Sequence, residues 1–85
     1  MKRIEDIAAA HPKVGVLLSP EAEVVRGQLA SIGLVTQDAD APGADWLITD
    51  GAVPAAALPV LRIERKVSIY ALKLAIISLF AGRAE

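Results

Sequence analysis

The chain has 85 residues and a formal net charge of −1, and 54% of its residues are hydrophobic although only 4% are aromatic. This length suits one small domain with an aliphatic core. The charge argues against a nucleic-acid-binding protein, since such proteins need an excess of Lys and Arg. The absence of Cys excludes disulfides and thiolate metal sites, and the single His excludes a multi-His metal site.

The sequence also gives no sign of a membrane segment. No apolar run approaches the roughly 20 residues that a membrane helix needs, and residues 1–10 lack the apolar centre of a signal peptide. We therefore expect a cytoplasmic protein without a membrane partner. Residues 1–12 are expected to be a linker or a short helix ending at His11-Pro12, and residues 13–85 to form the domain.

The first strand and helix of the domain follow one another closely. A continuous apolar run over residues 14–18 predicts a strand. Ser19 suits the N-cap of the next helix, Pro20 suits its first position, and Gly33 suits its end. The buried stripe of this helix is expected to consist of Ala22, Val25, Leu29 and Ile32.

The middle of the chain is organised around a second apolar run. Residues 34–36 predict a short strand, and residues 37–44 predict a loop because they contain two Asp, a Pro and a Gly. Residues 45–49 predict a buried central strand that ends at Asp50. Its Trp46 is expected to pack in the core, with an exposed binding anchor as the alternative. The Ala-rich residues 52–58 have room for one or two helical turns.

The last part of the chain predicts a strand at residues 59–63 and a helix at residues 68–81. Apolar strands that alternate with helices favour an α/β fold with a mainly parallel sheet and right-handed crossovers. We expect four strands in the order 2-1-3-4, a truncated flavodoxin-like layout with the first and last helices on one face.

The last helix is apolar on almost every side. Only Lys73 and Ser78 interrupt its apolar surface, so one side is expected to meet a neighbouring domain or a second copy of the chain. The alternative is that the small core buries the whole helix.

Several segments together resemble the receiver domain of two-component signalling. Residues 45–50 resemble the strand that ends in the phosphoacceptor, and residues 51–54 match the x-x-Met-Pro that follows it. Residues 66–68 and the last helix resemble the family's Lys and final helix, especially in bacterial hybrid histidine kinases. The similarity covers most of residues 13–82 and implies a receiver-like fold with Asp50 at the phosphoacceptor position.

The departures from that family concern its metal site. Receivers hold a divalent metal with two acids at the end of the first strand, where this chain has Leu18 and Ser19. The interval between Asp50 and Lys66 has room for only one strand, so the strand that carries the family's switch Ser/Thr is missing. The resemblance therefore implies a non-phosphorylatable pseudo-receiver with no required cofactor or metal, in which Asp50 is a vestigial phosphoacceptor.

This pseudo-receiver would be no enzyme itself but would control a histidine kinase, of the same or a partner protein, by docking through its final strand and helix. One alternative is an active phosphoacceptor that uses Asp50. Another is a pure interaction or dimerisation module without a ligand. A further reading gathers Asp38, Asp40 and Asp50 around Mg²⁺, although such a set is more often a solvated loop.

A cationic cluster follows the fourth strand and consists of Arg62, Arg65, Lys66 and Tyr70. Arg side chains bind phosphates with two parallel hydrogen bonds, and Tyr offers a stacking face for a base. Since some pseudo-receivers of hybrid kinases bind cyclic di-GMP, the resemblance implies that this cluster binds cyclic di-GMP and so regulates docking. The alternative is a charged strand end that faces water.

Overall fold

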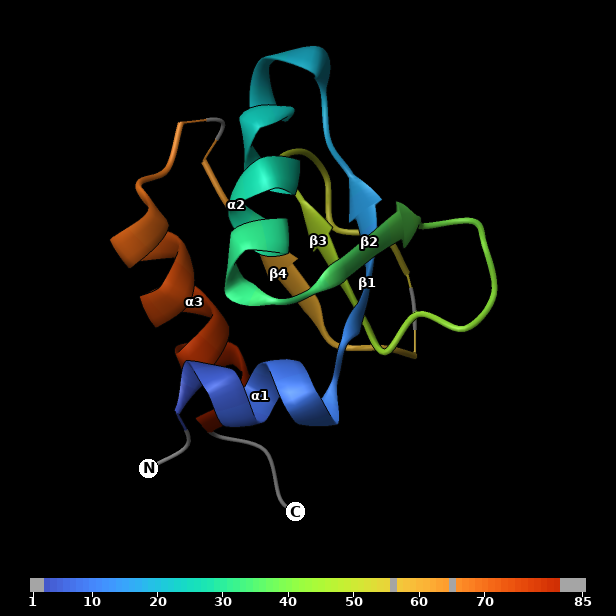
Figure 1. The fold of residues 1–85 in the computed structure, drawn as a ribbon. Helices are drawn as coiled ribbons and strands as arrows, with labels where there is room; N and C mark the ends of the chain where they lie inside the picture. The colour runs from blue at the N-terminus through green and yellow to red at the C-terminus, as the bar shows by residue number, and fades with distance from the viewer. Residues whose placement is uncertain (1–2, 56, 65, 82–85) are drawn as a thin grey trace.

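The computed structural model describes residues 3–55, 57–64 and 66–81. Within these ranges the chain is an α/β protein with one four-stranded parallel sheet and three α-helices (Figure 1). The strand order is β2-β1-β3-β4, which confirms the predicted order. The elements are, in chain order, α1 (Ile4–Ala10), β1 (Lys13–Leu17), the 3₁₀ turn η1 (Pro20–Ala22), α2 (Val24–Ile32), β2 (Val35–Asp38), β3 (Trp46–Thr49), β4 (Val60–Arg62) and α3 (Ile69–Ala81).

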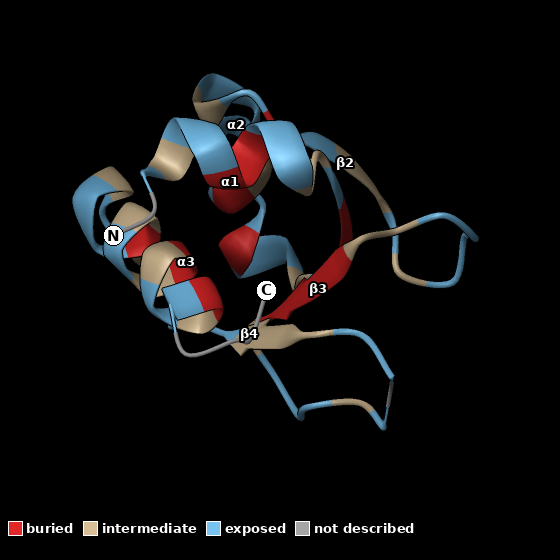
Figure 2. Cartoon of the chain, turned by 90° about the horizontal axis from the view of Figure 1, so that it is seen from below, coloured by how far each residue is buried: buried red, intermediate tan, exposed pale blue. Residues whose placement is uncertain are grey.

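The three helices lie on one side of the sheet, and the long connections lie on the other (Figures 1 and 2). The chain runs from β1 through α2 to β2 and then returns past β1 to β3. Because crossovers between parallel strands are right-handed, this reversal of direction moves the next connections to the opposite face. Residues 39–45, 50–55 and 57–59 accordingly project away from the helices (Figure 2). The described helices include none that is long and apolar enough to cross a membrane.

The core lies between the helices and one face of the sheet. Trp46 is fully buried on β3, which confirms its predicted place in the core. Its indole Nε1 donates a hydrogen bond to the backbone oxygen of His11 at 3.1 Å, and its ring meets Phe80 edge-on. His11 in turn stacks on Phe80 with ring centroids 4.6 Å apart. These contacts join the end of α1, the central strand and the end of α3.

The helix after β1 follows the predicted pattern with one exception. Val25 and Leu29 are fully buried, Ile32 is partly buried, and Gly33 ends α2 with a left-handed φ of 105°. Such a φ favours Gly, because a side chain would be strained there. Ser19 precedes η1 as expected, but its hydroxyl makes no capping hydrogen bond. The predicted N-cap position of Ser19 is therefore confirmed, but its side chain does not supply the capping hydrogen bond.

The Ala-rich segment also differs from its prediction. Its described residues, 52–55 and 57–58, form bends and irregular backbone rather than helical turns. Pro54 and Pro59 each disfavour the helical conformation in the residue before them. A short helix also needs an apolar face to bury, whereas Val53 is 56% exposed and Leu58 is 38% exposed.

Candidate functional site

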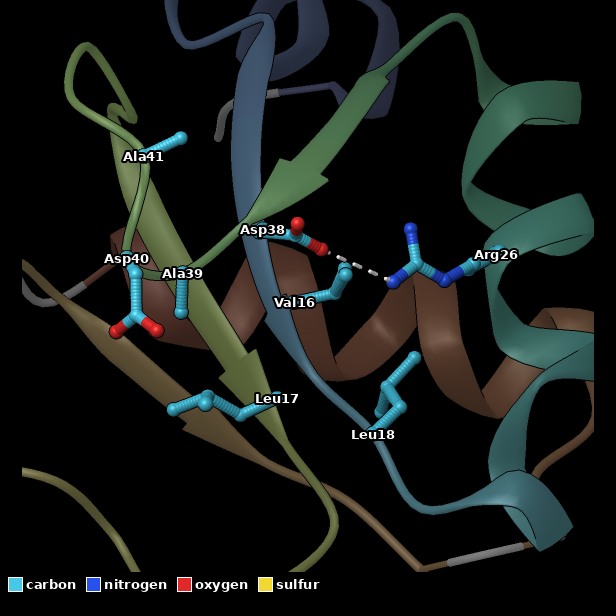
Figure 3. Close-up of a pocket in the computed structure, with 8 residues that line it drawn as sticks. All are labelled: Val16, Leu17, Leu18, Arg26, Asp38, Ala39, Asp40 and Ala41. Carbon is cyan, nitrogen blue, oxygen red and sulfur yellow. Dashed lines mark ion pairs between the residues drawn. The ribbon is translucent and has the colours of Figure 1, made fainter.

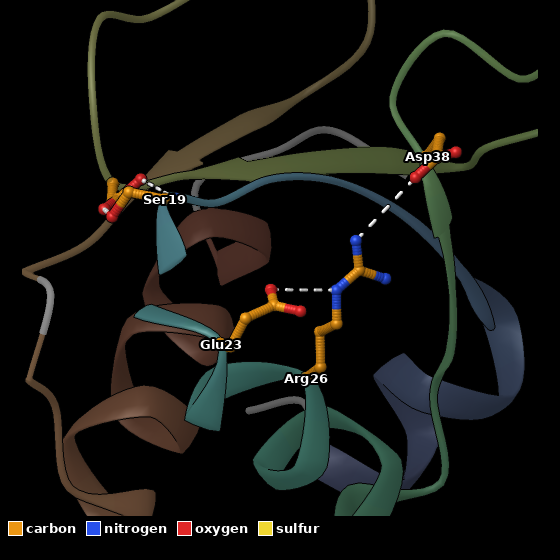
Figure 4. Close-up of polar contacts among 5 residues, drawn as sticks. Ser19, Glu23, Arg26 and Asp38 are labelled. Carbon is orange, nitrogen blue, oxygen red and sulfur yellow. Dashed lines mark hydrogen bonds and ion pairs between the residues drawn. The ribbon is translucent and has the colours of Figure 1, made fainter. Parts of the chain in front are cut away.

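The tip of β3 is tied directly to the tip of β1. Asp50 follows β3, and its Oδ1 accepts a hydrogen bond from the backbone N–H of Ser19 at 3.1 Å. Its Oδ2 accepts a second hydrogen bond from the Ser19 hydroxyl at 2.5 Å (Figure 4). The two residues are 31 positions apart in the chain, and they meet because β1 and β3 are neighbours in the sheet. We call this pair of hydrogen bonds the Ser19–Asp50 clamp.

The residues around Asp50 decide whether its carboxylate can accept a phosphoryl group. Phosphoryl transfer to a carboxylate needs a divalent cation, because charge develops on the phosphoryl oxygens. The two residues that follow β1 are Leu18 and Ser19, and neither offers a carboxylate. In the part of the chain that the structure describes, no group of three or more His, Cys, Asp or Glu is arranged to hold a metal. Asp38, Asp40 and Asp50 therefore do not form the acidic trio considered for Mg²⁺.

The predicted cationic cluster is spread over different parts of the fold. Leu61 packs on the core, so Arg62 leaves β4 toward the face without helices. Its Nε donates a hydrogen bond to the backbone oxygen of Gly51 at 3.0 Å, which ties β4 to the 50–59 connection. Lys66 is exposed, and Tyr70 is 76% exposed on α3, on the helical side. Arg65 lies outside the described residues. A ligand that contacts both Arg62 and Tyr70 would have to cross the end of β4.

A pocket of about 690 Å³ lies beyond the carboxyl ends of β1 and β2 (Figure 3). Its lining consists of Val16, Leu17, Leu18, Arg26, Asp38, Ala39, Asp40 and Ala41. The pocket forms where β2 ends and the chain turns away from the sheet. Gln37 Nε2 fastens this turn by donating hydrogen bonds to the backbone oxygens of Ala41 at 3.2 Å and Pro42 at 3.1 Å.

Glycine at position 15 allows the turn to sit close to the sheet. A Cβ at Gly15 would lie 3.1 Å from Ala39 Cα and 2.6 Å from Leu47 Cδ2. The second distance is shorter than real Cβ contacts, so a side chain at this position would displace its neighbours. The shape of the pocket therefore depends on a residue without a side chain on β1.

Charges of both signs line the pocket. Arg26 Nε donates to Glu23 Oε2 at 3.1 Å, and Arg26 Nη2 lies 3.7 Å from Asp38 Oδ1 (Figure 4). The Asp38 side chain is 84% exposed, so this longer ion pair contributes little to stability. Within the described ranges, no hydrogen bond or ion pair involves Asp40. The sequence did not identify Arg26 as a site residue, because its only local indication was a Glu three residues earlier, at position 23.

Tyr70 and Leu74, on the outer side of α3, have the largest exposed fractions among the described large hydrophobic residues. Tyr70 is 76% exposed and Leu74 is 65% exposed, while Leu72, Ile76 and Phe80 on the inner side are buried. The core therefore does not bury the whole helix, and the expected contact of its outer side with a neighbouring domain or a second copy stays a prediction.

Comparisons of the chain with protein-family models, with curated proteins and with solved structures find no match. The interpretation of the site therefore depends on its own geometry. That geometry provides the Ser19–Asp50 clamp, a mixed-charge pocket and an exposed apolar helix face.

Proposed function

We propose that this chain is a receiver-like regulatory domain that is not phosphorylated and acts by docking on other domains. The parallel sheet in the order 2-1-3-4, with helices on one face, supports a truncated flavodoxin-like layout. The observation that carries the proposal is the Ser19–Asp50 clamp. It places a hydroxyl and an amide, rather than metal-binding carboxylates, beside the acid at the tip of the central strand.

The clamp supports a structural role for Asp50. Both carboxylate oxygens accept hydrogen bonds from Ser19, so each is already engaged by the neighbouring strand end. Hydrogen bonds to a charged acceptor are about twice as strong as neutral ones, and breaking them would oppose attack by Asp50 on a phosphoryl group. Among the described residues, no group of three or more His, Cys, Asp or Glu is arranged to hold the divalent cation that phosphoryl transfer needs.

The exposed side of α3 supports docking as the remaining activity. Exposed apolar side chains that lie together on one surface mark protein-interaction sites. The docking partners in this proposal are the catalytic or dimerisation domains of a bacterial histidine kinase. A small-molecule ligand can change such docking only if it binds the docked and the free states of the domain with different affinities.

Cyclic di-GMP at the cationic cluster is the ligand that we propose for that regulation. Lys66 and Tyr70 are exposed near the start of α3, so a ligand there would touch the docking helix. Arg62 donates only its Nε to Gly51 in the described structure, which leaves the outer nitrogens of its guanidinium for phosphate oxygens.

Intact-mass spectrometry after incubation with acetyl phosphate and Mg²⁺ tests the proposed loss of phosphorylation. We expect the mass of the wild-type protein to stay unchanged. A mass increase of one phosphoryl group that persists in Asp40→Asn and disappears in Asp50→Asn would establish an active phosphoacceptor instead. Asp40→Asn is the matched control, because it removes an exposed carboxylate near the same edge of the sheet.

A further inference from the structure

The pocket beyond the carboxyl ends of β1 and β2 lies where two connections leave the sheet in opposite directions. After β1 the chain turns toward the helices and forms η1 and α2, whereas after β2 it turns to the other face and forms residues 39–45 (Figures 1 and 2). In open α/β sheets, connections that diverge in this way leave a crevice at the carboxyl ends of the strands, and ligands bind there. The volume of about 690 Å³ also falls in the range of small-molecule sites.

Arg26 supplies the positive charge of this pocket from the first turn of α2 (Figure 3). Its Nε donates a hydrogen bond to Glu23 Oε2 at 3.1 Å, while its Nη2 faces Asp38 (Figure 4). The 3.7 Å between Arg26 Nη2 and Asp38 Oδ1 is too long for a hydrogen bond. The outer nitrogens of Arg26 therefore keep N–H donors for a carboxylate of a ligand, which a guanidinium can bind with two parallel hydrogen bonds.

Two carboxylates supply the negative charge of the pocket. Asp38 ends β2, and Asp40 follows in the turn, across the pocket from Arg26 (Figure 3). Within the part of the chain that the structure describes, the Asp40 side chain has no hydrogen bond or ion pair, and the Asp38 side chain has only its long contact with Arg26. Both carboxylates can therefore accept hydrogen bonds from an ammonium group.

The lining between these charges is apolar. It consists of Val16 and Leu17 of β1, together with Leu18, Ala39 and Ala41. Val16 is buried, whereas Leu17 is 39% exposed, so part of this apolar lining is in contact with water in the free chain. An aliphatic group of a ligand would cover it and gain the free energy of burial.

The charges of the pocket restrict the kind of ligand that fits. A simple anion would reach Arg26 but would also meet two carboxylates, and a simple cation would leave the donors of Arg26 unused. A divalent metal ion needs several converging oxygens, and the described residues contain no group of three or more His, Cys, Asp or Glu arranged for one. A zwitterion, in contrast, engages charges of both signs and leaves the net charge of the pocket unchanged.

We propose that this pocket binds a free α-amino acid with an aliphatic side chain. The carboxylate of the amino acid bonds to Arg26, its ammonium group bonds to Asp40 and Asp38, and its side chain covers the apolar lining. This inference goes beyond the proposed docking function, because it involves neither Asp50 nor the cationic cluster nor α3.

The exposure of the charged groups indicates weak binding. The Asp38 side chain is 84% exposed and the Arg26 side chain is 36% exposed, so water and salt compete with the ligand for both. We therefore expect a Kd on the order of 1 mM for L-leucine, which weakens as the salt concentration rises.

NMR titration of the isotope-labelled protein with L-leucine tests the proposal. We expect saturable shifts of the backbone amide signals of Arg26 and residues 39–41. L-leucinamide lacks the carboxylate, N-acetyl-L-leucine lacks the ammonium group, and glycine lacks the aliphatic group, so each should bind at least about threefold more weakly. If L-leucine causes no saturable shifts at these residues, the pocket does not bind amino acids. If L-leucinamide or N-acetyl-L-leucine binds as tightly as L-leucine, only one charge is recognised and the zwitterion proposal is wrong.

Asp40→Asn tests the contact with the ammonium group. The substitution keeps the size of the side chain and removes no hydrogen bond or ion pair among the described residues, so the variant should fold like the wild type. We expect it to bind L-leucine at least about threefold more weakly. Asp6→Asn is the matched control, because Asp6 is also exposed but lies on α1, outside the pocket, and this variant should bind like the wild type. Equal affinities of Asp40→Asn and the wild type would refute the proposal.

Discussion

Replacing Ser19 with Ala should destabilise the domain by removing half of the Ser19–Asp50 clamp. The hydroxyl donates to Asp50 Oδ2 at 2.5 Å in a partly buried site. The variant keeps the backbone N–H that donates to Oδ1. Because the Ser19 hydroxyl makes no capping hydrogen bond to η1, the loss can be attributed to the clamp rather than to a helix cap.

The size of the effect follows from the type of hydrogen bond. A hydrogen bond to a charged group contributes about 1.5–3 kcal/mol, and partial exposure to water lowers this, so we expect a loss of about 1–2 kcal/mol. In a domain of this size, 1 kcal/mol corresponds to roughly 4–8 °C in Tm. The Tm of Ser19→Ala should therefore fall by about 4–16 °C. Ser19→Thr keeps the hydroxyl and should recover part of the loss.

Urea denaturation followed by Trp46 fluorescence measures the free energy of unfolding, with Ser31→Ala as the matched control. Ser31 is exposed on α2, and its hydroxyl donates to the backbone oxygen of Gln28 at 2.7 Å. Since Ala is the better helix former, this control should change stability by less than about 0.5 kcal/mol. If Ser19→Ala is as stable as Ser31→Ala, the clamp does not hold the strand ends together and the structural role of Asp50 is wrong.

Three other outcomes are expected. Gly15→Ala should lower the free energy of unfolding by about 1–2 kcal/mol in urea denaturation, because its Cβ would lie 3.1 Å from the backbone atom Ala39 Cα as well as 2.6 Å from Leu47 Cδ2. Gly27→Ala, with open space around its Cβ and a place inside α2, should instead raise it by about 0.5–1 kcal/mol, and equal effects would contradict the packing argument. Ser68→Ala should lower the free energy of unfolding by about 1 kcal/mol, because the Ser68 hydroxyl accepts a hydrogen bond from the backbone N–H of Ala71 at the start of α3. An unchanged midpoint of urea denaturation would show that this cap does not contribute to stability. Calorimetric titration of the wild type with cyclic di-GMP should give a heat of binding, and Arg62→Ala or Tyr70→Ala should abolish it. If the wild type gives no heat of binding, the proposal of cyclic di-GMP as the ligand is wrong.

Most of the sheet could be predicted because parallel strands that are buried on both faces consist of continuous runs of apolar residues. The run at residues 14–18 corresponds to β1, with a shift of one residue, and residues 45–49 contain β3. The alternation of apolar strands with helices favoured a parallel sheet, and the strand order was predicted from the flavodoxin-like layout. The prediction failed at the described residues of this range, 52–55 and 57–58, where Ala-rich composition suggested helix but Val53 and Leu58 remain exposed and bury no apolar face.

The candidate site was less predictable, because its contacts join residues that are far apart in the chain. The sequence placed Ser19 at a strand end and favoured a local cap, yet its hydroxyl bonds to Asp50, 31 residues away. The pocket beside Arg26 depends on the turn after β2, which no local pattern describes. The cationic cluster was predicted from closeness in sequence together with the family resemblance, whereas the structure places Arg62 on β4 and Tyr70 on α3.

The sequence alone determined where most of the strands and helices form, because the spacing of apolar residues indicates which side of each element is buried. It also determined that α3 has more apolar surface than one small core needs. Only the tertiary structure decided which of those side chains remain outside, since that depends on how α3 lies against α1 and β4. Ile77 packs partly on the core, while Tyr70 and Leu74 stay exposed. These two exposed side chains form the surface that we propose for docking.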